Sequence, residues 1–390
     1  MSFNVHKKAV TSFDRCSTED DKEGAADGGV YVFDVDCVSD GSSVVVSTSD
    51  NYLTSYDPES FSQIRKIKAH SEMINCFDLS KKSSSLVFSA SNDHFIHGWD
   101  LRVAECSPII KIKLSDDVTA LSVGISDTLI AAGCGSAISF YDIRCSSNWS
   151  SGKEAAKLGE YSDIHTDTVT QLRFSLANSQ MLVSGAEDGL VSLFDTSAAD
   201  GDDAVVSILN TECPIRRIGF FGASDEALYC LSTTETASFW HCASAQRVGD
   251  FPNIREELGV DYLVDCMYDV ANDNLCMIAG DYDGGGKIAV IEPTALRVIG
   301  DISKGGHNAT IRCAKYLNSS SENKRIITGG EDANICSWNI SANNVLSSFD
   351  DSVKLNTENS KILGLKDGSG SSLKSTVSSS KKNERRQKPY

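Results

Sequence analysis

Short apolar runs separated by polar turns recur along the chain. The runs are rich in Val, Ile, Phe and Tyr, and Ser, Asp and Gly stand between them. The first two groups of four runs occupy residues 30–35, 44–46, 52–56 and 64–67, and then residues 73–79, 86–91, 95–101 and 109–114. Short runs of β-branched and aromatic residues bounded by turn residues predict β-strands. The pattern therefore predicts an all-β chain built from four-stranded units.

A fixed polar spacing accompanies three of these units. In each, a turn Asp has a hydroxyl residue four positions before it and an aromatic residue six positions after it, and a His precedes the Asp by 23 to 25 residues. If the Asp orients the His, the His can reach the hydroxyl, and the hydroxyl can accept from an indole N–H, so that each polar group is satisfied. We therefore predict a structural relay in three units, made by His70, Ser89, Asp93 and Trp99; by His165, Ser184, Asp188 and Phe194; and by His307, Thr328, Asp332 and Trp338.

Four weaker copies of the pattern fill the intervals. They are Asp50 with Tyr56 and Asp57, Gly135 with Tyr141 and Asp142, Thr234 with Trp240 and His241, and Gly285 with Ile291 and Glu292. Seven units repeat with a period of about 45 residues, which is typical of propeller blades. The predicted fold class is all-β, a seven-bladed β-propeller, and such a ring closes without exposed sheet edges.

The Trp99-Asp100 dipeptide after the turn at Asp93 resembles the signature of WD40 repeats. Several longer stretches are similar to the family of WD repeat-containing protein 89, namely residues 165–195, 229–230, 239–240, 261–263, 305–312 and 328–333, together with the basic C-terminal tail. This resemblance implies a seven-bladed propeller in an intracellular protein that interacts with other proteins. It brings no catalytic residues.

The pattern divides the chain into three regions. They are a flexible N-terminal segment at residues 1–27, the propeller at residues 28–350 and a disordered basic tail at residues 351–390. The outer strand that closes the ring is expected from residues 5–13 or from residues 345–349, and the sequence leaves both open. A single helical turn is expected at residues 254–258.

Charge differs sharply between the tail and the rest of the chain. The formal net charge is −18; residues 371–390 hold six Lys and Arg against one Glu, a net charge of +5, so the remainder carries −23. An acidic propeller argues against a broad nucleic-acid surface and favours at least one basic protein partner, or it serves solubility alone. The tail is either solvated or a nuclear-targeting or nucleic-acid-contacting patch, formed by Lys381, Lys382, Arg385, Arg386 and Lys388.

Cysteine usage and hydropathy indicate the compartment. Thirteen cysteines are scattered through the chain without a C-x-x-C pair, as in a reducing environment. The start of the sequence lacks the apolar run of a signal peptide, and no segment is long enough to cross a bilayer. We expect a cytoplasmic or nuclear protein, or one found in both, that contacts no membrane and works as a monomer within a larger complex.

Two adjacent units end in a similar motif, Asp100 with Arg102 and Asp142 with Arg144. The stretches that lead into these residues resemble the box of substrate receptors in cullin-4 ubiquitin ligases, although Gly98 stands where that box has an aliphatic residue. The resemblance implies that the arginines bind the ligase adaptor through their planar guanidinium groups. The alternative is that each Arg pairs with an acidic neighbour on its own rim.

Catalytic and metal-binding motifs are missing from the sequence. It contains no G-x-S-x-G, H-E-x-x-H or P-loop motif. His94 and His97 are three residues apart, which on a strand places them on opposite faces, so we interpret them as turn and strand-surface residues rather than metal ligands. The sequence predicts a non-enzymatic protein-interaction scaffold without cofactor or metal. A cullin-4 substrate receptor and a scaffold in a nuclear, nucleic-acid-associated complex are the alternatives.

Overall fold

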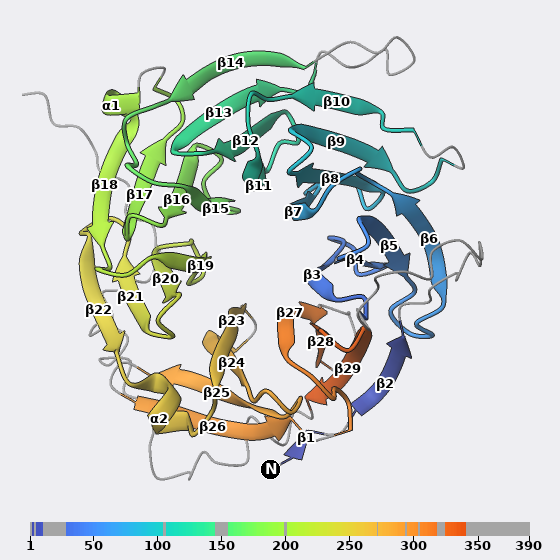
Figure 1. The fold of residues 1–390 in the computed structure, drawn as a ribbon. Coiled ribbons are helices and arrows are strands. Elements are labelled where there is room, and N and C mark those ends of the chain that lie inside the picture. Colours follow the sequence, from blue (N-terminus) through green and yellow to red (C-terminus); the bar gives the residue numbers. More distant parts are fainter. Residues whose placement is uncertain are drawn as a thin grey trace, which may run out of the picture. The chain divides into compact units, whose positions relative to one another are not determined.

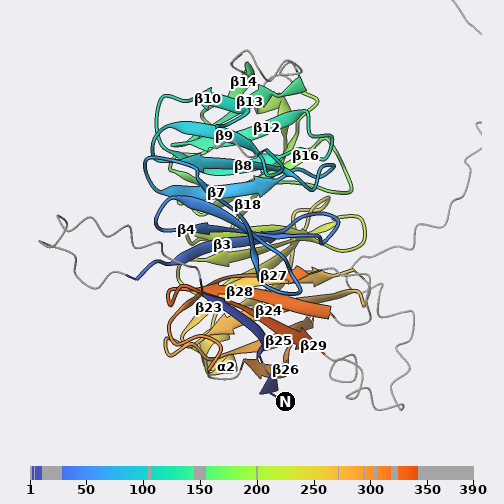
Figure 2. The ribbon, with the colours of Figure 1, turned by 90° about the vertical axis from the view of Figure 1, so that its right-hand side faces the viewer.

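The computed structural model contains seven β-sheets arranged in a ring around a central channel (Figure 1, Figure 2). It describes residues 2–3, 5–10, 29–103, 107–144, 155–198, 201–270, 272–292, 295–302, 305–317 and 324–340. Within each sheet, neighbouring strands are antiparallel, apart from one parallel pair at an outer edge. The predicted seven-bladed propeller is confirmed.

Blades 1 to 4 each use four consecutive strands, which we call A to D from the channel outward. Blade 1 contains β3 (Val32–Cys37), β4 (Val44–Thr48), β5 (Tyr52–Tyr56) and β6 (Gln63–Lys68). Blade 2 contains β7 (Ile74–Leu79), β8 (Leu86–Ser91), β9 (Phe95–Asp100) and β10 (Ile110–Lys113). Blade 3 contains β11 (Val118–Val123), β12 (Leu129–Cys134), β13 (Ala137–Asp142) and β14 (Ala156–Tyr161). Blade 4 contains β15 (Val169–Phe174), β16 (Met181–Ala186), β17 (Leu190–Asp195) and β18 (Val205–Asn210).

Blades 5 to 7 complete the ring and carry the second of two short helices. Blade 5 contains β19 (Ile215–Phe221), β20 (Ala227–Ser232), β21 (Ala237–His241) and β22 (Gln246–Phe251). Blade 6 contains β23 (Tyr262–Asp269), β24 (Asn274–Gly280), β25 (Gly286–Glu292) and β26 (Ala295–Ile302), and blade 7 contains β27 (Ile311–Leu317), β28 (Lys324–Gly330), β29 (Asn334–Ile340) and β2 (Val5–Val10). Helix α1 (Gly201–Ala204) precedes β18, and α2 (Ile254–Leu258) is the predicted helical turn between blades 5 and 6.

The N-terminal residues close the ring. Strand β2 pairs antiparallel with β29, so the start of the chain supplies the outer strand of blade 7. Before it, β1 (Ser2–Phe3) pairs parallel with β26, the outer strand of blade 6. The N-terminus thus joins two neighbouring blades (Figure 1). The other segment considered for closure, residues 345–349, lies outside the described residues.

Hydrogen bonds join the inner strands of neighbouring blades. Each A strand has a register shift near its start, a local bulge against strand B. The side chain at the bulge reaches the next blade in four consecutive cases, the last of which joins Arg216 to the Leu263 carbonyl. The first three bonds run from Asn75 to the Val118 carbonyl at 2.9 Å, from Thr119 to Val169 at 2.7 Å and from Thr170 to Ile215 at 2.7 Å.

The apolar core lies between the blades. Leu53 and Ile67 of blade 1 pack in one cluster with Ile74, Phe77 and Trp99 of blade 2, and comparable clusters join other neighbours. Each sheet therefore buries both faces, which explains strands such as β4 and β20 that are buried along their whole length. In the part of the chain that the structure describes, no helix combines the length and apolarity needed to cross a membrane.

Candidate functional site

The polar residues predicted to form a relay in blade 2 make one hydrogen-bonded chain. His70 Nδ1 lies 3.0 Å from each Asp93 carboxylate oxygen, and its Nε2 lies 2.8 Å from Ser89 Oγ. Trp99 Nε1 donates to the same Ser89 oxygen at 3.0 Å. A neutral imidazole that donates from Nδ1 and accepts at Nε2 satisfies every member of this chain.

Blades 4 and 7 repeat the arrangement. His165 contacts Asp188 at 3.1 Å and Ser184 at 2.6 Å, and Phe194 fills the position of the indole without donating. In blade 7 the partners of His307 are Asp332 at 3.0 Å and Thr328 at 2.8 Å, and Trp338 Nε1 donates to Thr328 at 2.7 Å. The structure therefore brings together all three sets of residues that the spacing singled out.

Burial sets the charge of these groups. It lowers the pKa of His70 and of His165, and the facing aspartates offset this only in part. Burial acts to raise the pKa of Asp93, but His70 and backbone N–H groups outweigh it and hold that pKa below its usual range. Near neutral pH the relay of blade 2 therefore contains a neutral His70 imidazole beside the Asp93 carboxylate.

The interpretation of His97 as a strand-surface residue was wrong. Its ring is buried and stacks on His70 with ring centroids 4.5 Å apart. Nδ1 lies 3.0 Å from the Ala69 carbonyl oxygen, and Nε2 has no hydrogen-bond partner in the part of the chain described. Burial lowers the pKa of His97 to about 4.

The propeller has two faces, which we name by their side chains. The turns that enter the A strands and those that join B to C strands lie on one face, the relay face, with His70 and Asp93. The turns that join A to B and C to D strands lie on the other, the arginine face, with Arg102 and Arg144. The alternation of antiparallel strands fixes this assignment.

Each arginine of the second face is held by the Asp two residues before it. Arg102 Nε and Nη2 lie 3.0 and 2.7 Å from the Asp100 carboxylate, and Arg144 repeats the geometry with Asp142 at 3.0 and 2.6 Å. The arginine bonds lower the pKa of both aspartates. The Arg102 and Arg144 side chains nevertheless remain 74% and 66% exposed. Both arginines thus pair within their own blade, as the second interpretation of the motif expects, and still face solvent.

A groove lies beside Arg102. A cavity of about 550 Å³ opens between blades 1 and 2, and its lining includes Ile64, Lys82, Leu101 and Arg102. The departure at Gly98 has a packing reason, because a Cβ there would lie 3.0 Å from Ile110 and 3.1 Å from Phe88. A larger residue at this position therefore requires Ile110 and Phe88 to shift by a few tenths of an ångström.

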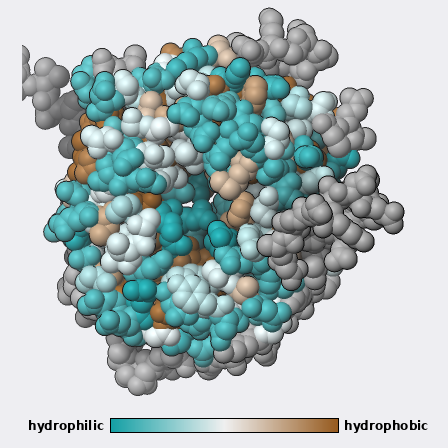
Figure 3. Space-filling view, in the orientation of Figure 1, coloured by the Kyte–Doolittle hydropathy of each residue, from teal (hydrophilic) through white to brown (hydrophobic). Residues whose placement is uncertain are grey.

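A second cavity, which the sequence did not predict, occupies the channel at the arginine face. Its volume is about 500 Å³, and its lining includes Asp36, Asp78, Arg173, Asp265 and Lys315. These residues come from inner strands of five blades. Figure 3 shows the other end of the channel, at the relay face, where hydrophilic residues surround the central opening. The available signal was the presence of charged residues within otherwise apolar A strands, at positions about one blade period apart.

Two other groups of residues give weaker evidence for a functional site. The tail residues Lys381, Lys382, Arg385, Arg386 and Lys388 lie outside the described residues. Among the residues that are described, His94, Asp116 and Asp117 have potential ligand atoms within 4.8 Å of one another, but they are exposed or half-exposed side chains at the relay face. Exposed acidic groups commonly gather in this way without binding a metal.

Comparison with known proteins agrees with the repeat geometry. The family model "WD domain, G-beta repeat" matches residues 61–100, 159–195 and 301–339, and each match contains one complete relay. The chain is 27% identical over 356 residues to WD repeat-containing protein 89 homolog of Dictyostelium discoideum, covering 89% of this chain and 91% of the relative. It is 29% identical over 329 residues to WD repeat-containing protein GTS1 of Arabidopsis thaliana, covering 80% of this chain and 81% of the relative.

Proposed function

Because this chain is a WD40-repeat β-propeller, similar to WD repeat-containing protein 89, we propose that it is a non-enzymatic scaffold that binds other proteins through its arginine face. Rigid blades hold the turns of this face in fixed positions, and such turns are the usual recognition elements of a propeller. On the relay face, the polar groups of the relays are engaged in hydrogen bonds with one another, and their His, Ser and Thr members are buried.

One observation carries the proposal: Arg102 and Arg144 occupy the same position in adjacent blades and are held in the same way. The Asp100 and Asp142 carboxylates fix one edge of each guanidinium group. A side chain that is already ordered loses less conformational entropy when a partner binds. An ion pair this exposed contributes little to folding stability, so its stabilising effect does not explain the duplication.

The finer candidate for the partner is the adaptor of a cullin-4 ubiquitin ligase. Two observations support it, the resemblance of the residues before Arg102 and Arg144 to the receptor box and the presentation of both arginines on one face. In this role the chain is a substrate receptor, and the partner supplies carboxylate or carbonyl groups to the guanidinium edges.

Co-precipitation with a double variant tests the arginine face. We expect Arg102→Ala with Arg144→Ala to reduce recovery of partners by roughly tenfold or more while the melting temperature is unchanged. The matched control is Arg247→Ala with Arg297→Ala, which removes two ion-paired arginines from the outer strands of blades 5 and 6. Equal recovery of partners with both double variants would contradict the proposal. If the partners that depend on Arg102 and Arg144 do not include the ligase adaptor, the cullin-4 candidate is contradicted.

The negative charge of the chain supports a further part of the proposal, namely that at least one partner is basic. The net charge of −18 attracts basic surfaces, and exposed Asp202 and Asp203 in α1 add local negative charge. Quantitative affinity purification at low and high salt tests this. Basic partners should be lost preferentially as ionic strength rises.

The basic tail supports a second candidate, a scaffold in a nuclear, nucleic-acid-associated complex. Its charge of +5 over residues 371–390 contrasts with the acidic remainder. A reporter fused to residues 371–390 should accumulate in the nucleus, and a reporter that stays diffuse would count against this candidate.

A further inference from the structure

The lining of the channel cavity at the arginine face includes one residue at an equivalent position of each inner strand. In each A strand, pairing with strand B resumes at one residue after the bulge, and the lining residue lies two positions further along. The seven blades therefore contribute equivalent positions. The seven residues are Asp36, Asp78, Ser122, Arg173, Gly219, Met267 and Lys315. We call them the cavity ring. It contains two acidic and two basic residues.

Three charged members of the cavity ring already have partners. Lys315 lies 3.2 Å from Asp36, and Asp78 lies 2.5 Å from Lys81 in the following turn. Asp78 also accepts a hydrogen bond at 2.8 Å from the backbone N–H of Val123 in the next blade. These pairs cancel one another's charge inside the cavity.

Two other carboxylates of the cavity are also engaged. Asp265 accepts from the Tyr229 hydroxyl at 3.0 Å and from a backbone N–H at 2.8 Å. The Tyr229 ring takes this position because Gly219 has no side chain, since a Cβ there would lie 2.5 Å from the ring. Asp225 accepts from Ser175 at 2.7 Å and from two backbone N–H groups of the same turn.

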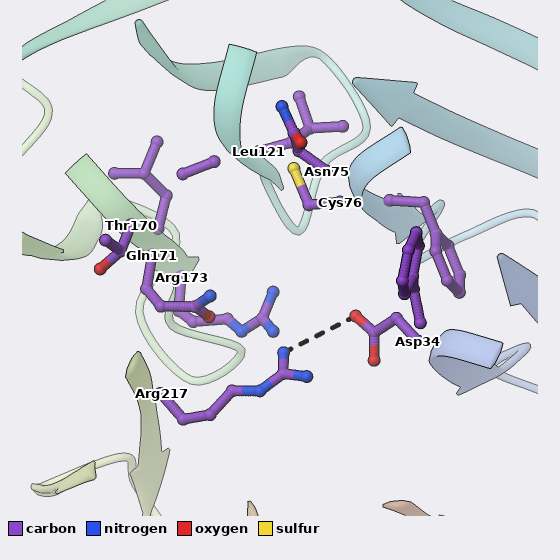
Figure 4. A pocket seen from close by; sticks show the side chains of 12 residues that line it. Asp34, Asn75, Cys76, Leu121, Thr170, Gln171, Arg173 and Arg217 are labelled. Atoms are coloured by element: carbon purple, nitrogen blue, oxygen red, sulfur yellow. Dashed lines mark ion pairs between the residues drawn. The ribbon is translucent and has the colours of Figure 1, made fainter. Parts of the chain in front are cut away.

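Arg173 is the exception. Among the described residues, no carboxylate lies within 4 Å of its guanidinium group and no hydrogen bond to it is present, so Asp78 and Asp34, which raise its pKa against the effect of burial, act on it from a longer distance. The neighbouring Arg217 reaches across the channel to Asp34, at 3.7 Å (Figure 4). A guanidinium group has five N–H donors, and polar groups inside a protein are normally hydrogen-bonded. The arginine therefore presents unused donors to the channel.

The mouth of the same cavity is apolar on one side. Leu176 and Val270, in the turns after the A strands of blades 4 and 6, line it and are 60% and 71% exposed. Apolar side chains this exposed beside a cavity are common where another molecule binds. The cavity thus combines an apolar mouth with a cationic group at greater depth.

We propose that this cavity binds a linear segment of a partner protein, whose Asp or Glu side chain pairs with Arg173 while an adjacent apolar side chain packs on Leu176 and Val270. The inference rests on the scaffold function proposed above and names the chemistry of one binding site. It is compatible with a partner that is basic overall, because one acidic side chain enters the channel while the remaining positive charge faces the acidic body.

The donors of Arg173 favour a carboxylate as the occupant. One partner carboxylate matches the single cation of the cavity ring that has no close counter-ion. A cation in the same place would be repelled by Arg173, and the carboxylates of Asp36 and Asp78 are already paired with lysines. A doubly charged phosphate would bring a second negative charge near Asp36 and Asp78, at a cost in desolvation and repulsion.

The test selects binders from a random linear-peptide library on the full chain. Selected peptides should share an acidic residue next to an apolar one. Binding of each peptide and its Glu→Gln or Asp→Asn version is then measured with the wild type and with Arg173→Met, which together form a double-mutant cycle. The acid should contribute roughly tenfold or more in affinity with the wild type and little with Arg173→Met.

Two additional variants complete the test. Arg173→Lys keeps the positive charge but lacks the planar guanidinium group, so it should bind the acidic peptides with intermediate affinity. This variant provides the comparison if Arg173→Met is unstable. Arg297→Met, on the outer strand of blade 6, is the matched control and should bind like the wild type. Melting temperatures report folding.

Three outcomes would overturn the inference: no enriched peptide, enriched peptides without an acidic residue, or equal losses from the acid substitution in the wild type and in Arg173→Met. None of them depends on co-precipitation with the Arg102 and Arg144 variants. Partners recovered there, together with a negative peptide result, would leave the scaffold proposal standing without this site.

Discussion

The relay face and the arginine face place the same side chain, aspartate, in different surroundings. In blade 2, Asp93 accepts from a fully buried imidazole of His70, whereas Asp100, seven residues later, holds the exposed guanidinium group of Arg102. Both carboxylates have pKa values below the usual range, the first because His70 and backbone N–H groups outweigh its burial and the second chiefly because of the Arg102 bonds. The local chemistry is similar, and the burial of the partner differs.

This comparison separates stability from recognition. Removing a buried partner leaves a polar group without water or hydrogen bond, which costs far more than the net value of the bond. Removing an exposed partner returns both groups to water. Substitutions on the two faces should therefore affect different measurements, and the predictions below run from the largest effect on stability to the smallest.

Loss of a relay histidine should have the largest effect. His307→Ala removes the partner of both Asp332 and Thr328 and opens space beside Trp338, so we expect a loss of roughly 3 kcal/mol in the free energy of unfolding. Equilibrium denaturation measures this loss. The control His241→Ala removes a half-exposed histidine and should change stability by less than about 1 kcal/mol. Similar losses from both would contradict the structural role of the relay.

A matched pair of aspartates tests the comparison within one blade. Asp93→Asn should destabilise the protein by roughly 1–3 kcal/mol, because an amide cannot replace the carboxylate that accepts from His70 and two backbone N–H groups. Asp100→Asn should cost less than about 1 kcal/mol. Equal costs in denaturation experiments would show that burial does not distinguish the two faces.

Stability should fall in mild acid before the carboxylates titrate. The pKa of His97 is about 4 in the folded state against 6.5 for the ordinary value, and burial also lowers the pKa of His70 and of His165. The unfolded state therefore binds more protons below pH 6.5, so this contribution to stability is complete above pH 6.5 and declines as the pH falls towards 4. Melting temperatures from pH 7.5 to 4 measure the slope. His97→Phe should reduce it, and an unchanged slope would contradict the burial of this imidazole.

The arginine pair should have the smallest effect on stability. We expect Arg102→Ala with Arg144→Ala to change the free energy of unfolding by less than about 1 kcal/mol, although partner recovery falls. Denaturation and co-precipitation of the same preparation measure the two effects together. A stability loss comparable to that of His307→Ala would assign these arginines to folding instead of binding.

Much of the fold could be predicted from local patterns. The spacing of Ser89, Asp93 and Trp99 recurs because one blade builds its hydrogen bonds among residues close in sequence, and only the His comes from the preceding turn. The same pattern located blades 4 and 7. The motif at Arg102 and Arg144 was visible for the same reason, since the partner of each arginine is two residues away.

Other features depend on contacts between distant segments. The position of His97 in the alternation of its strand predicted an exposed side chain. The side chain is buried because the His70 ring of the preceding turn covers it. Ring closure by Val5–Val10 depends on pairing with a strand more than three hundred residues away. A local pattern does not distinguish that pairing from closure by residues near 345.

The sequence by itself determined the seven repeating units, their strands and the relays, because each of these is decided by side chains within one repeat. The tertiary structure alone decided which end of the chain closes the ring, which residues form the channel cavity and which charges there cancel. Arg173 and the carboxylates around it are distant in sequence, and only the circular arrangement of blades sets their separations. Electrostatic pairing depends on those separations, so the unpaired guanidinium group was not visible in the sequence.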